Sequence, residues 1–280
     1  MVKMSSVKLF AFGGDLNREL SDQIEAMRRN HLSGIELGET EFGPISDISF
    51  VAACLIRKKL NDSGLEVLAL GSGIGRIGIK DDFEAQLEKL KNTLEVCRVL
   101  GADKVRVSSF FIPGFENPDD YKQLVIDRLG RMNELAGSHG VTLCLENRSG
   151  CFGGTAARCH DILSALPEMV GVFNPAEFIK AKEDVMDSWE ILRSRIAYIH
   201  ISDISEESKP VPAGSGIAHI RDLTRKFIER GGRNFSIDPH LTVKRSPNKQ
   251  DEHDRYTYRN ADAAFDAASG AFKSVVGIGN

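Results

Sequence analysis

The sequence predicts an α/β protein that folds as one (β/α)8 barrel, the TIM barrel, and three observations support this. Short apolar segments alternate with amphipathic segments along the chain, as in parallel strands separated by helices. Eight of the apolar segments qualify as strands, and 280 residues is an ordinary length for such a barrel. No linker, internal repeat or low-complexity segment divides the chain. Residues 1–280 are therefore expected to form a single domain.

The expected elements follow one another in regular order. The strands cover residues 7–12, 34–37, 65–70, 104–110, 141–147, 170–174, 196–203 and 235–239. The clearest helix spans 81–102, where acids open the segment and Gly101 closes it. A second helix is expected within 118–140, after Pro118, and a third within 219–232, near Gly231.

An open, doubly wound sheet is the alternative fold, and the glycine pattern argues against it. The first strand-to-helix turn, FGGDLNRE, lacks the G-x-G-x-x-G spacing of a dinucleotide site. That spacing occurs later, in GIGRIG at 73–78, but no acid ends the following strand at the required distance. We therefore interpret 73–78 as a flexible loop over the barrel mouth.

Composition and charge narrow the range of partners. The chain has 41% hydrophobic and 27% charged residues and a net charge of -4, without a basic run that could follow a nucleic-acid backbone. Neither a signal-peptide core nor a stretch of ~20 apolar residues is present, so no membrane contact and a cytoplasmic location are expected. Five cysteines without a C-x-x-C pair are expected to be free thiols.

Four consecutive strands end in polar side chains that share one parity. Side chains alternate along a strand, so residues of one parity point into the barrel together. The four residues are Glu146, Asn174, His200 and Asp238. Each alone has an ordinary explanation as a cap, a turn residue or a core histidine. Together, at the barrel end where active sites lie, they favour a site for Mn²⁺, Mg²⁺ or Zn²⁺.

At these positions the sequence resembles the xylose isomerase-like TIM barrels, also called the sugar phosphate isomerase/epimerase family. The matching segments follow the family's order: LCLEN (143–147), VGVFNPAEF (170–178), YIHISD (198–203), VPAGSGIAHI (211–220) and IDPHL (237–241). The resemblance implies a divalent ion (Mn, Zn, Mg or Co) held by Glu, Asp, His and Glu at the ends of strands five to eight. Glu146 and His200 match, whereas Asn174 replaces the Asp and Asp238 replaces the second Glu.

The carboxylate missing at Asn174 reappears three residues later, at Glu177. We expect Glu177 to reach back and restore the charge, so Glu146, Asn174, Glu177, His200 and Asp238 are the predicted metal ligands. The resemblance further implies that Glu146 and Asp238 are the catalytic carboxylates. They would move a proton beside a sugar carbonyl, through a metal-stabilised enediolate, in an isomerase or epimerase of carbohydrate metabolism.

Other polar residues near the predicted strand ends are candidates for binding a carbohydrate substrate. They are Glu36, Arg106, Arg148 and His240. Arg148 in particular could hold an anionic or phosphate group, although a surface ion pair is the ordinary alternative for both arginines.

Three other functions stay open on the sequence alone. One is a dehydratase or lyase acting on a keto-sugar or cyclitol at the same site, and another is a non-catalytic barrel that binds a polyol. A DNA-repair endonuclease of the same superfamily ranks last, because only His200 and His240 lie at inward strand ends and that class needs a histidine-rich cluster. A homo-oligomer is possible, with residues 242–260 either covering the site or forming an interface.

Overall fold

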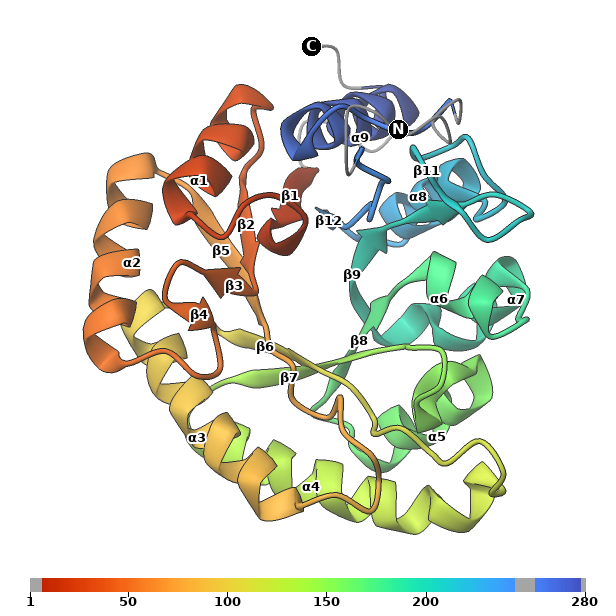
Figure 1. The fold of residues 1–280 in the computed structure, drawn as a ribbon. Helices are drawn as coiled ribbons and strands as arrows, with labels where there is room; N and C mark the ends of the chain where they lie inside the picture. Colours follow the sequence, from red (N-terminus) through yellow and green to blue (C-terminus); the bar gives the residue numbers. More distant parts are fainter. Residues whose placement is uncertain (1–6, 245–254, 278–280) are drawn as a thin grey trace.

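The computed structural model describes residues 7–244 and 255–277, in which eight parallel strands close into a barrel (Figure 1). Their order around the barrel is β1, β12, β9, β8, β7, β6, β5 and β2. The barrel strands are β1 (Lys8–Phe12), β2 (Gly34–Leu37), β5 (Glu66–Gly71), β6 (Lys104–Val107), β7 (Thr142–Glu146), β8 (Val170–Phe173), β9 (Ile196–Ile201) and β12 (Asn234–Ile237). The (β/α)8 fold predicted from the alternating segments is confirmed, and each expected strand overlaps one of these.

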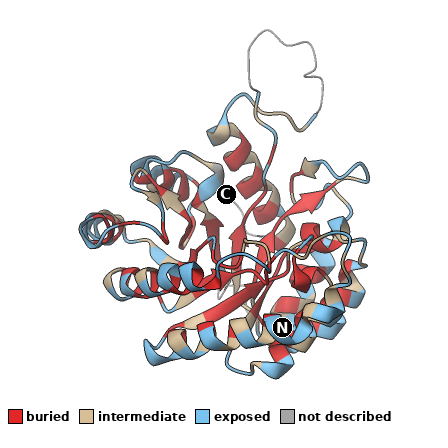
Figure 2. Ribbon diagram, turned by 60° about the horizontal axis from the view of Figure 1, so that its bottom comes forward, coloured by how far each residue is buried: buried red, intermediate tan, exposed pale blue. Residues whose placement is uncertain are grey.

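Helices form the outer ring and pack against the barrel, so their ribbons in Figure 2 are partly red, for buried residues, and partly tan or pale blue. They are α1 (Leu20–Arg29), α2 (Phe50–Ser63), α3 (Phe83–Leu100), α4 (Lys122–Ser138), α5 (Ala156–Ala165), α6 (Pro175–Lys180), α7 (Val185–Leu192), α8 (Ile220–Glu229) and α9 (Ala261–Val276). Two short hairpins, β3–β4 (Glu39–Thr40, Gly43–Pro44) and β10–β11 (Asp203–Ile204, Pro210–Val211), project from the barrel. No helix in the described part of the chain is long and apolar enough to cross a membrane.

The predicted ends of the clearest helix are confirmed in α3. The Asp82 side chain accepts hydrogen bonds from the backbone N–H groups of Glu84 and Ala85, and Gly101 ends the helix with a φ of 69°. An acid at the N-cap satisfies otherwise unpaired donors, and glycine adopts the left-handed conformation that a side chain resists.

The side chains inside the barrel form an apolar part and a polar part. The apolar part comprises Phe10, Leu68, Ala69, Cys144, Val172 and Tyr198. On β7, Cys144 and Glu146 point inward while Leu143 and Leu145 join the core between barrel and helices, so the predicted parity is confirmed. The polar part lies toward the carboxyl ends of the strands and contains charged side chains. A barrel that buries charges beneath its mouth must pair each of them.

Three segments that follow β5, β6 and β7 are hydrogen-bonded to one another at the mouth; we call residues 74–79, 108–112 and 148–152 the rim platform. Backbone N–H groups of Ser108, Phe110 and Phe111 donate to the carbonyls of Ile74, Gly75 and Ile77 at 3.0, 2.9 and 2.8 Å. The third segment joins because Phe111 bridges to both Gly78 and Cys151. Residues 73–78 lie at the mouth, as predicted. They are hydrogen-bonded to residues 108–111, however, and do not form the flexible loop that was expected.

The pairing of the rim platform also explains why β6 stops at Val107, three residues before its predicted end. Ser108 and the residues after it leave the barrel ladder and bond to the segment after β5. Phe110 takes a positive φ of 65° at this turn.

Gly75→Ala is expected to lower the free energy of unfolding by about 2 kcal/mol or more. Gly75 has a φ of 78°, and an added Cβ would lie 2.0 Å from the carbonyl oxygen of Ser108. Gly73→Ala is the matched control, because an added Cβ there meets nothing within 4 Å. Urea denaturation of both variants checks this, and equal effects would mean that the rim platform does not depend on the close approach at Gly75.

All five cysteines are free, as expected; Cys54 is exposed and the others are buried. The segment 242–260 lies partly outside the described residues. Its two ends pair, since the Lys244 N–H donates to the Tyr258 carbonyl and the Tyr258 N–H donates to the Thr242 carbonyl.

Candidate metal centre and active site

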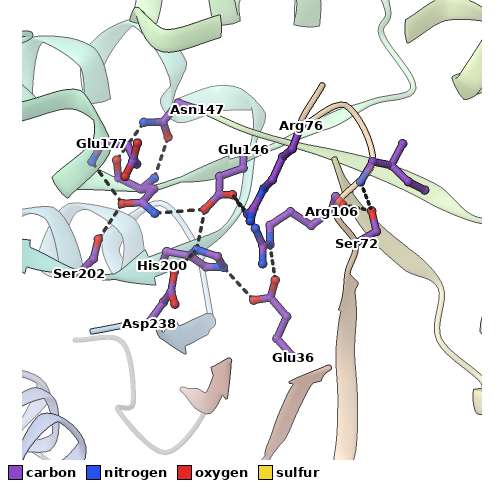
Figure 3. A network of polar contacts seen from close by, with 12 residues as sticks. Glu36, Ser72, Arg76, Arg106, Glu146, Asn147, Glu177, His200, Ser202 and Asp238 are labelled. Atoms are coloured by element: carbon purple, nitrogen blue, oxygen red, sulfur yellow. Dashed lines mark hydrogen bonds and ion pairs between the residues drawn. The ribbon is translucent and has the colours of Figure 1, made fainter. Parts of the chain in front are cut away.

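Three buried side chains meet at the carboxyl end of the barrel (Figure 3). Glu146 is the last residue of β7, His200 lies in β9, and Asp238 directly follows β12. One potential ligand atom from each lies within 4.8 Å of the others. His200 Nδ1 is 2.9 Å from Glu146 Oε1 and 3.2 Å from Asp238 Oδ2. The structure thus brings together three of the five predicted ligands.

Glu36, from β2, fixes the orientation of the His200 ring. Its Oε2 lies 2.7 Å from His200 Nε2 and accepts a hydrogen bond from the Ser236 hydroxyl at 2.8 Å. The Tyr198 hydroxyl donates to the other oxygen at 3.3 Å. With Nε2 held by a carboxylate from below, Nδ1 is the ring nitrogen that faces Glu146 and Asp238.

Arg106, from β6, joins two of these carboxylates. Its Nε donates to Glu36 Oε1 and its Nη1 donates to Glu146 Oε2, both at 2.5 Å. Glu36 and Arg106 were predicted to bind substrate. In the structure both are buried beneath the mouth with their charges paired, an arrangement suited to positioning His200 and Glu146.

The buried charges set the protonation of the cluster. Burial alone would raise the pKa of Glu146, but Arg106 and His200 outweigh it and hold that pKa well below its usual range. For Asp238, burial is likewise outweighed by His240 and His200, so its pKa also lies well below the ordinary value. Both carboxylates are therefore ionised at neutral pH.

The same balance acts in the opposite direction on His200. Burial opposes a charged imidazolium, but the carboxylates of Glu36 and Glu146 hold the pKa of His200 well above its usual range. Without a cation in the cluster, the ring is therefore protonated near neutral pH.

The residues present fit a divalent metal ion. His200 Nδ1 is buried, and its near neighbours are carboxylate oxygens of Glu146 and Asp238 at 2.9 and 3.2 Å. Carboxylates gathered around one buried nitrogen need a cation among them to offset their mutual repulsion, either the proton of the imidazolium or a metal ion. A Glu–His–Asp donor set suits Zn²⁺ or Mn²⁺, and a carboxylate on the far ring nitrogen is the usual support of a metal-binding histidine.

Asn174 lies beside the cluster but presents a nitrogen to it. It follows β8 as the N-cap of α6, where its Oδ1 accepts from the Glu177 N–H and from the Ser202 hydroxyl at 3.3 and 2.7 Å. Its Nδ2 donates to Glu146 Oε1 at 3.1 Å. An amide N–H group cannot ligate a cation, so in this arrangement Asn174 supports Glu146 as a hydrogen-bond donor.

Glu177 is buried but turned away from the cluster. Its Oε2 accepts from the Ser149 N–H at 3.0 Å, and its Oε1 lies 2.7 Å from Lys180 Nζ. Both oxygens therefore have partners outside the cluster. The carboxylate predicted to replace the missing acid is not among the residues that meet at His200.

His240 and Arg148, the remaining predicted substrate contacts, lie at the edge of the site. The half-exposed His240 places Nε2 at 3.3 Å from Asp238 Oδ1. Arg148 comes two residues after Glu146, within the rim platform, and its buried Nε makes no hydrogen bond. Both positions are close enough to the mouth to meet a bound molecule.

Arg76 is a site residue that the sequence reasoning did not select. It lies in the rim platform, and its Nη2 is 3.3 Å from Glu146 Oε2. The glycine-rich segment around it, GIGRIG, was the available signal. Only the pairing of that segment with residues 108–111 brings its arginine over β7.

A family model described as xylose isomerase-like TIM barrel matches residues 24–253. Among curated proteins no sequence match was found.

Solved structures with the same fold include several enzymes. The probable 3-DHS dehydratase AsbF of Bacillus anthracis superposes with a TM-score of 0.74 at 16% identity, covering 95% of this chain and 98% of that one. The 3-keto-D-glucoside 4-epimerase YcjR of E. coli gives 0.70 at 14% identity, covering 96% and 98%. The IOLI protein, whose structure holds a zinc atom, gives 0.74 at 17% identity, covering 96% and 98%. At such identities the likeness establishes the fold.

Proposed function

Because this chain belongs to the xylose isomerase-like TIM barrel family, we propose that it is a divalent-metal-dependent enzyme that isomerises or epimerises a sugar or sugar derivative. The observation that carries the proposal is the buried cluster in which His200 Nδ1 lies 2.9 and 3.2 Å from carboxylate oxygens of Glu146 and Asp238. Glu146, His200 and Asp238 would hold the ion. A bound divalent cation would polarise the carbonyl and hydroxyl oxygens of a hydroxycarbonyl substrate.

The two carboxylates are suited to unequal roles in proton transfer. Glu146 is held by three donors, from Arg106, Arg76 and Asn174, which leave its carboxylate little freedom to move toward a substrate carbon. Asp238 has an oxygen whose near neighbour is the half-exposed His240. We assign Asp238 to remove the proton beside the carbonyl and His240 to exchange that proton with solvent.

The anchoring of Glu146 favours a second candidate reaction at the same site. Epimerisation needs a base on one face of the carbon and an acid on the other, whereas elimination of water can proceed with a single base and an activated leaving hydroxyl. A dehydratase acting on a keto-sugar or cyclitol is therefore the alternative. A polyol-binding barrel without catalysis would apply if the cluster takes up no metal.

Two measurements test the proposal. Elemental analysis after loading with Mn, Co, Zn or Mg should give about one ion per chain, and a chain without metal would contradict metal dependence. Solvent deuterium should then enter ketoses or their phosphates at the carbon beside the carbonyl. Loss of water from keto-sugars without exchange into any ketose would select the dehydratase.

Metal affinity is expected to rise about tenfold per pH unit through the neutral range. The ion must displace a proton from His200, whose pKa is held well above its usual range by Glu36 and Glu146 against the effect of burial. Below that pKa the proton is present and must leave. Above it nothing is displaced, and the affinity levels off.

Calorimetric titration in buffers of different ionisation enthalpy measures this linkage. Release of about one proton per ion at pH 7 is the expected result. Binding without proton release would mean that His200 is neutral before the ion arrives, or that it is not a ligand.

A further inference from the structure

Two arginines on the rim platform have hydrogen-bonding capacity that the protein does not use. Arg76 and Arg148 each carry a buried Nε without a partner. Arg76 makes a single contact of 3.3 Å with Glu146, an acid that Arg106 already holds at 2.5 Å. Within residues 7–244 and 255–277, no carboxylate lies at ion-pair distance from Arg148. A guanidinium presents its donors in a planar fork that matches a carboxylate or phosphate group.

The backbone beneath these arginines is fixed. The Arg76 N–H donates to the Gly73 carbonyl at 3.1 Å, and the Cys151 N–H donates to the Arg148 carbonyl at 3.1 Å. The two segments are joined through Phe111, which bridges to Gly78 on one side and to Cys151 on the other. Donors held on a rigid frame bind an anion with little loss of conformational entropy.

The net charge of the metal-loaded centre also favours an anionic ligand. Three carboxylates, from Glu36, Glu146 and Asp238, balance the three guanidinium groups of Arg76, Arg106 and Arg148. A divalent ion held by neutral His200 would then leave an excess of two positive charges. A neutral sugar would leave that excess uncompensated, whereas an acidic sugar derivative would offset it.

We propose that Arg76 and Arg148 form an oxyanion-binding pair at the rim of the centre, and that the substrate carries a carboxylate or phosphate group that they bind. The anion site stands on the two arginines themselves. Its assignment to a substrate rests on the proposed metal-dependent function. Such a substrate is a sugar acid or a sugar phosphate, oriented by its anionic group so that its hydroxycarbonyl end faces Glu146 and Asp238.

Calorimetric titration of the metal-loaded full chain with inorganic phosphate, D-glucuronate, D-fructose 6-phosphate and D-fructose tests the pair. At least one anion should bind more tightly than D-fructose. Arg76→Gln and Arg148→Gln should each weaken the binding of anions about tenfold more than the binding of D-fructose. Arg76→Lys and Arg148→Lys should retain part of the affinity, since the charge remains. Preference for glucuronate or for the phosphates identifies which group the substrate carries.

Arg98→Gln is the matched control, because Arg98 is exposed on α3 and pairs with Glu95. Repeating the phosphate titration in EDTA separates the arginines from any bound cation. A loss of affinity specific to Arg76 and Arg148 in EDTA supports the anion site even if no metal binds and the proposed function fails. Equal phosphate affinity of wild type and both glutamine variants, with and without metal, overturns the anion site and leaves the metal centre standing.

Discussion

Glu146→Gln is expected to remove the bound metal ion and to lower turnover by at least about 10³-fold, while the barrel stays folded. The substitution keeps the size of the side chain and removes its charge. One of the three ligands that meet at His200 is then a neutral amide, and the anionic oxygen nearest Nδ1 is gone. Elemental analysis and deuterium exchange into substrate measure the two losses.

The barrel should survive because the damage to packing is local. The groups that face Glu146 are donors: Arg106 Nη1, Arg76 Nη2 and Asn174 Nδ2. An amide brings two N–H groups of its own, so one donor must face another, and the buried Arg106 loses one of its two anionic partners, which together cost about 3–5 kcal/mol. That is less than the ~5–15 kcal/mol by which a domain is stable, and urea denaturation should show a cooperative transition with a lower midpoint.

Glu177→Gln is the informative comparison, because Glu177 is also a buried glutamate and lies in α6, directly after the neighbouring strand β8. Its oxygens face the Ser149 N–H and Lys180, so the loss of its charge should leave metal stoichiometry unchanged. If Glu177→Gln lost the ion while Glu146→Gln kept it, the ligand assignment would be reversed. The carboxylate would then have to turn inward when metal binds.

Local patterning was sufficient to predict the barrel and the three residues that meet at its mouth. Period-two alternation fixes which side chains of β7 and β9 point inward, so Glu146 and His200 could be placed without a structure. Asp238 follows from the same reasoning at the end of β12. These inferences need only the parity of a strand and the rule that parallel strands end at one edge.

The turn after β8 carried a local signal that points away from metal binding. In N-P-A-E, Asn174 stands at an N-cap, Pro175 at the first helical position and Glu177 at the third, which is a typical opening of a helix. The structure has this cap. Where the Glu177 carboxylate goes depends on Ser149, which is distant in sequence, so its direction could not be read from the turn alone.

The role of Arg76 could not be predicted from the sequence either, because it depends on contacts between segments that are distant in the chain. Its position over Glu146 depends on backbone bonds between the segments after β5 and β6, which lie more than thirty residues apart in the chain. No propensity or periodicity encodes such a pairing. Long-range register at the ends of strands therefore limits how much of a barrel's site can be derived from its sequence.

Arg106→Met is expected to lower the free energy of unfolding by about 3–5 kcal/mol, the second large effect that the structure predicts. Methionine fills the volume but leaves the carboxylates of Glu36 and Glu146 buried without their shared cation. Removal of one partner from a buried ion pair is costly because the remaining charge stays desolvated. Chemical denaturation in EDTA at pH 7 measures the loss without a contribution from metal binding.

The pH dependence identifies the cause of that loss. In the wild type, Arg106 helps to hold the pKa of Glu146 well below its ordinary value against burial, so this carboxylate stabilises the fold above its unfolded pKa and loses that contribution as pH falls. In Arg106→Met, burial favours the neutral form of the Glu146 carboxyl group. Lowering the pH protonates this group and so removes the buried unpaired charge. The difference in stability between wild type and variant should therefore shrink as pH falls below about 5.

Adding Glu36→Gln to Arg106→Met should recover part of the stability at pH 7, because one unpaired charge is removed. Additive losses in the double variant, with a gap independent of pH, would show that Arg106 acts through packing and not through its charge.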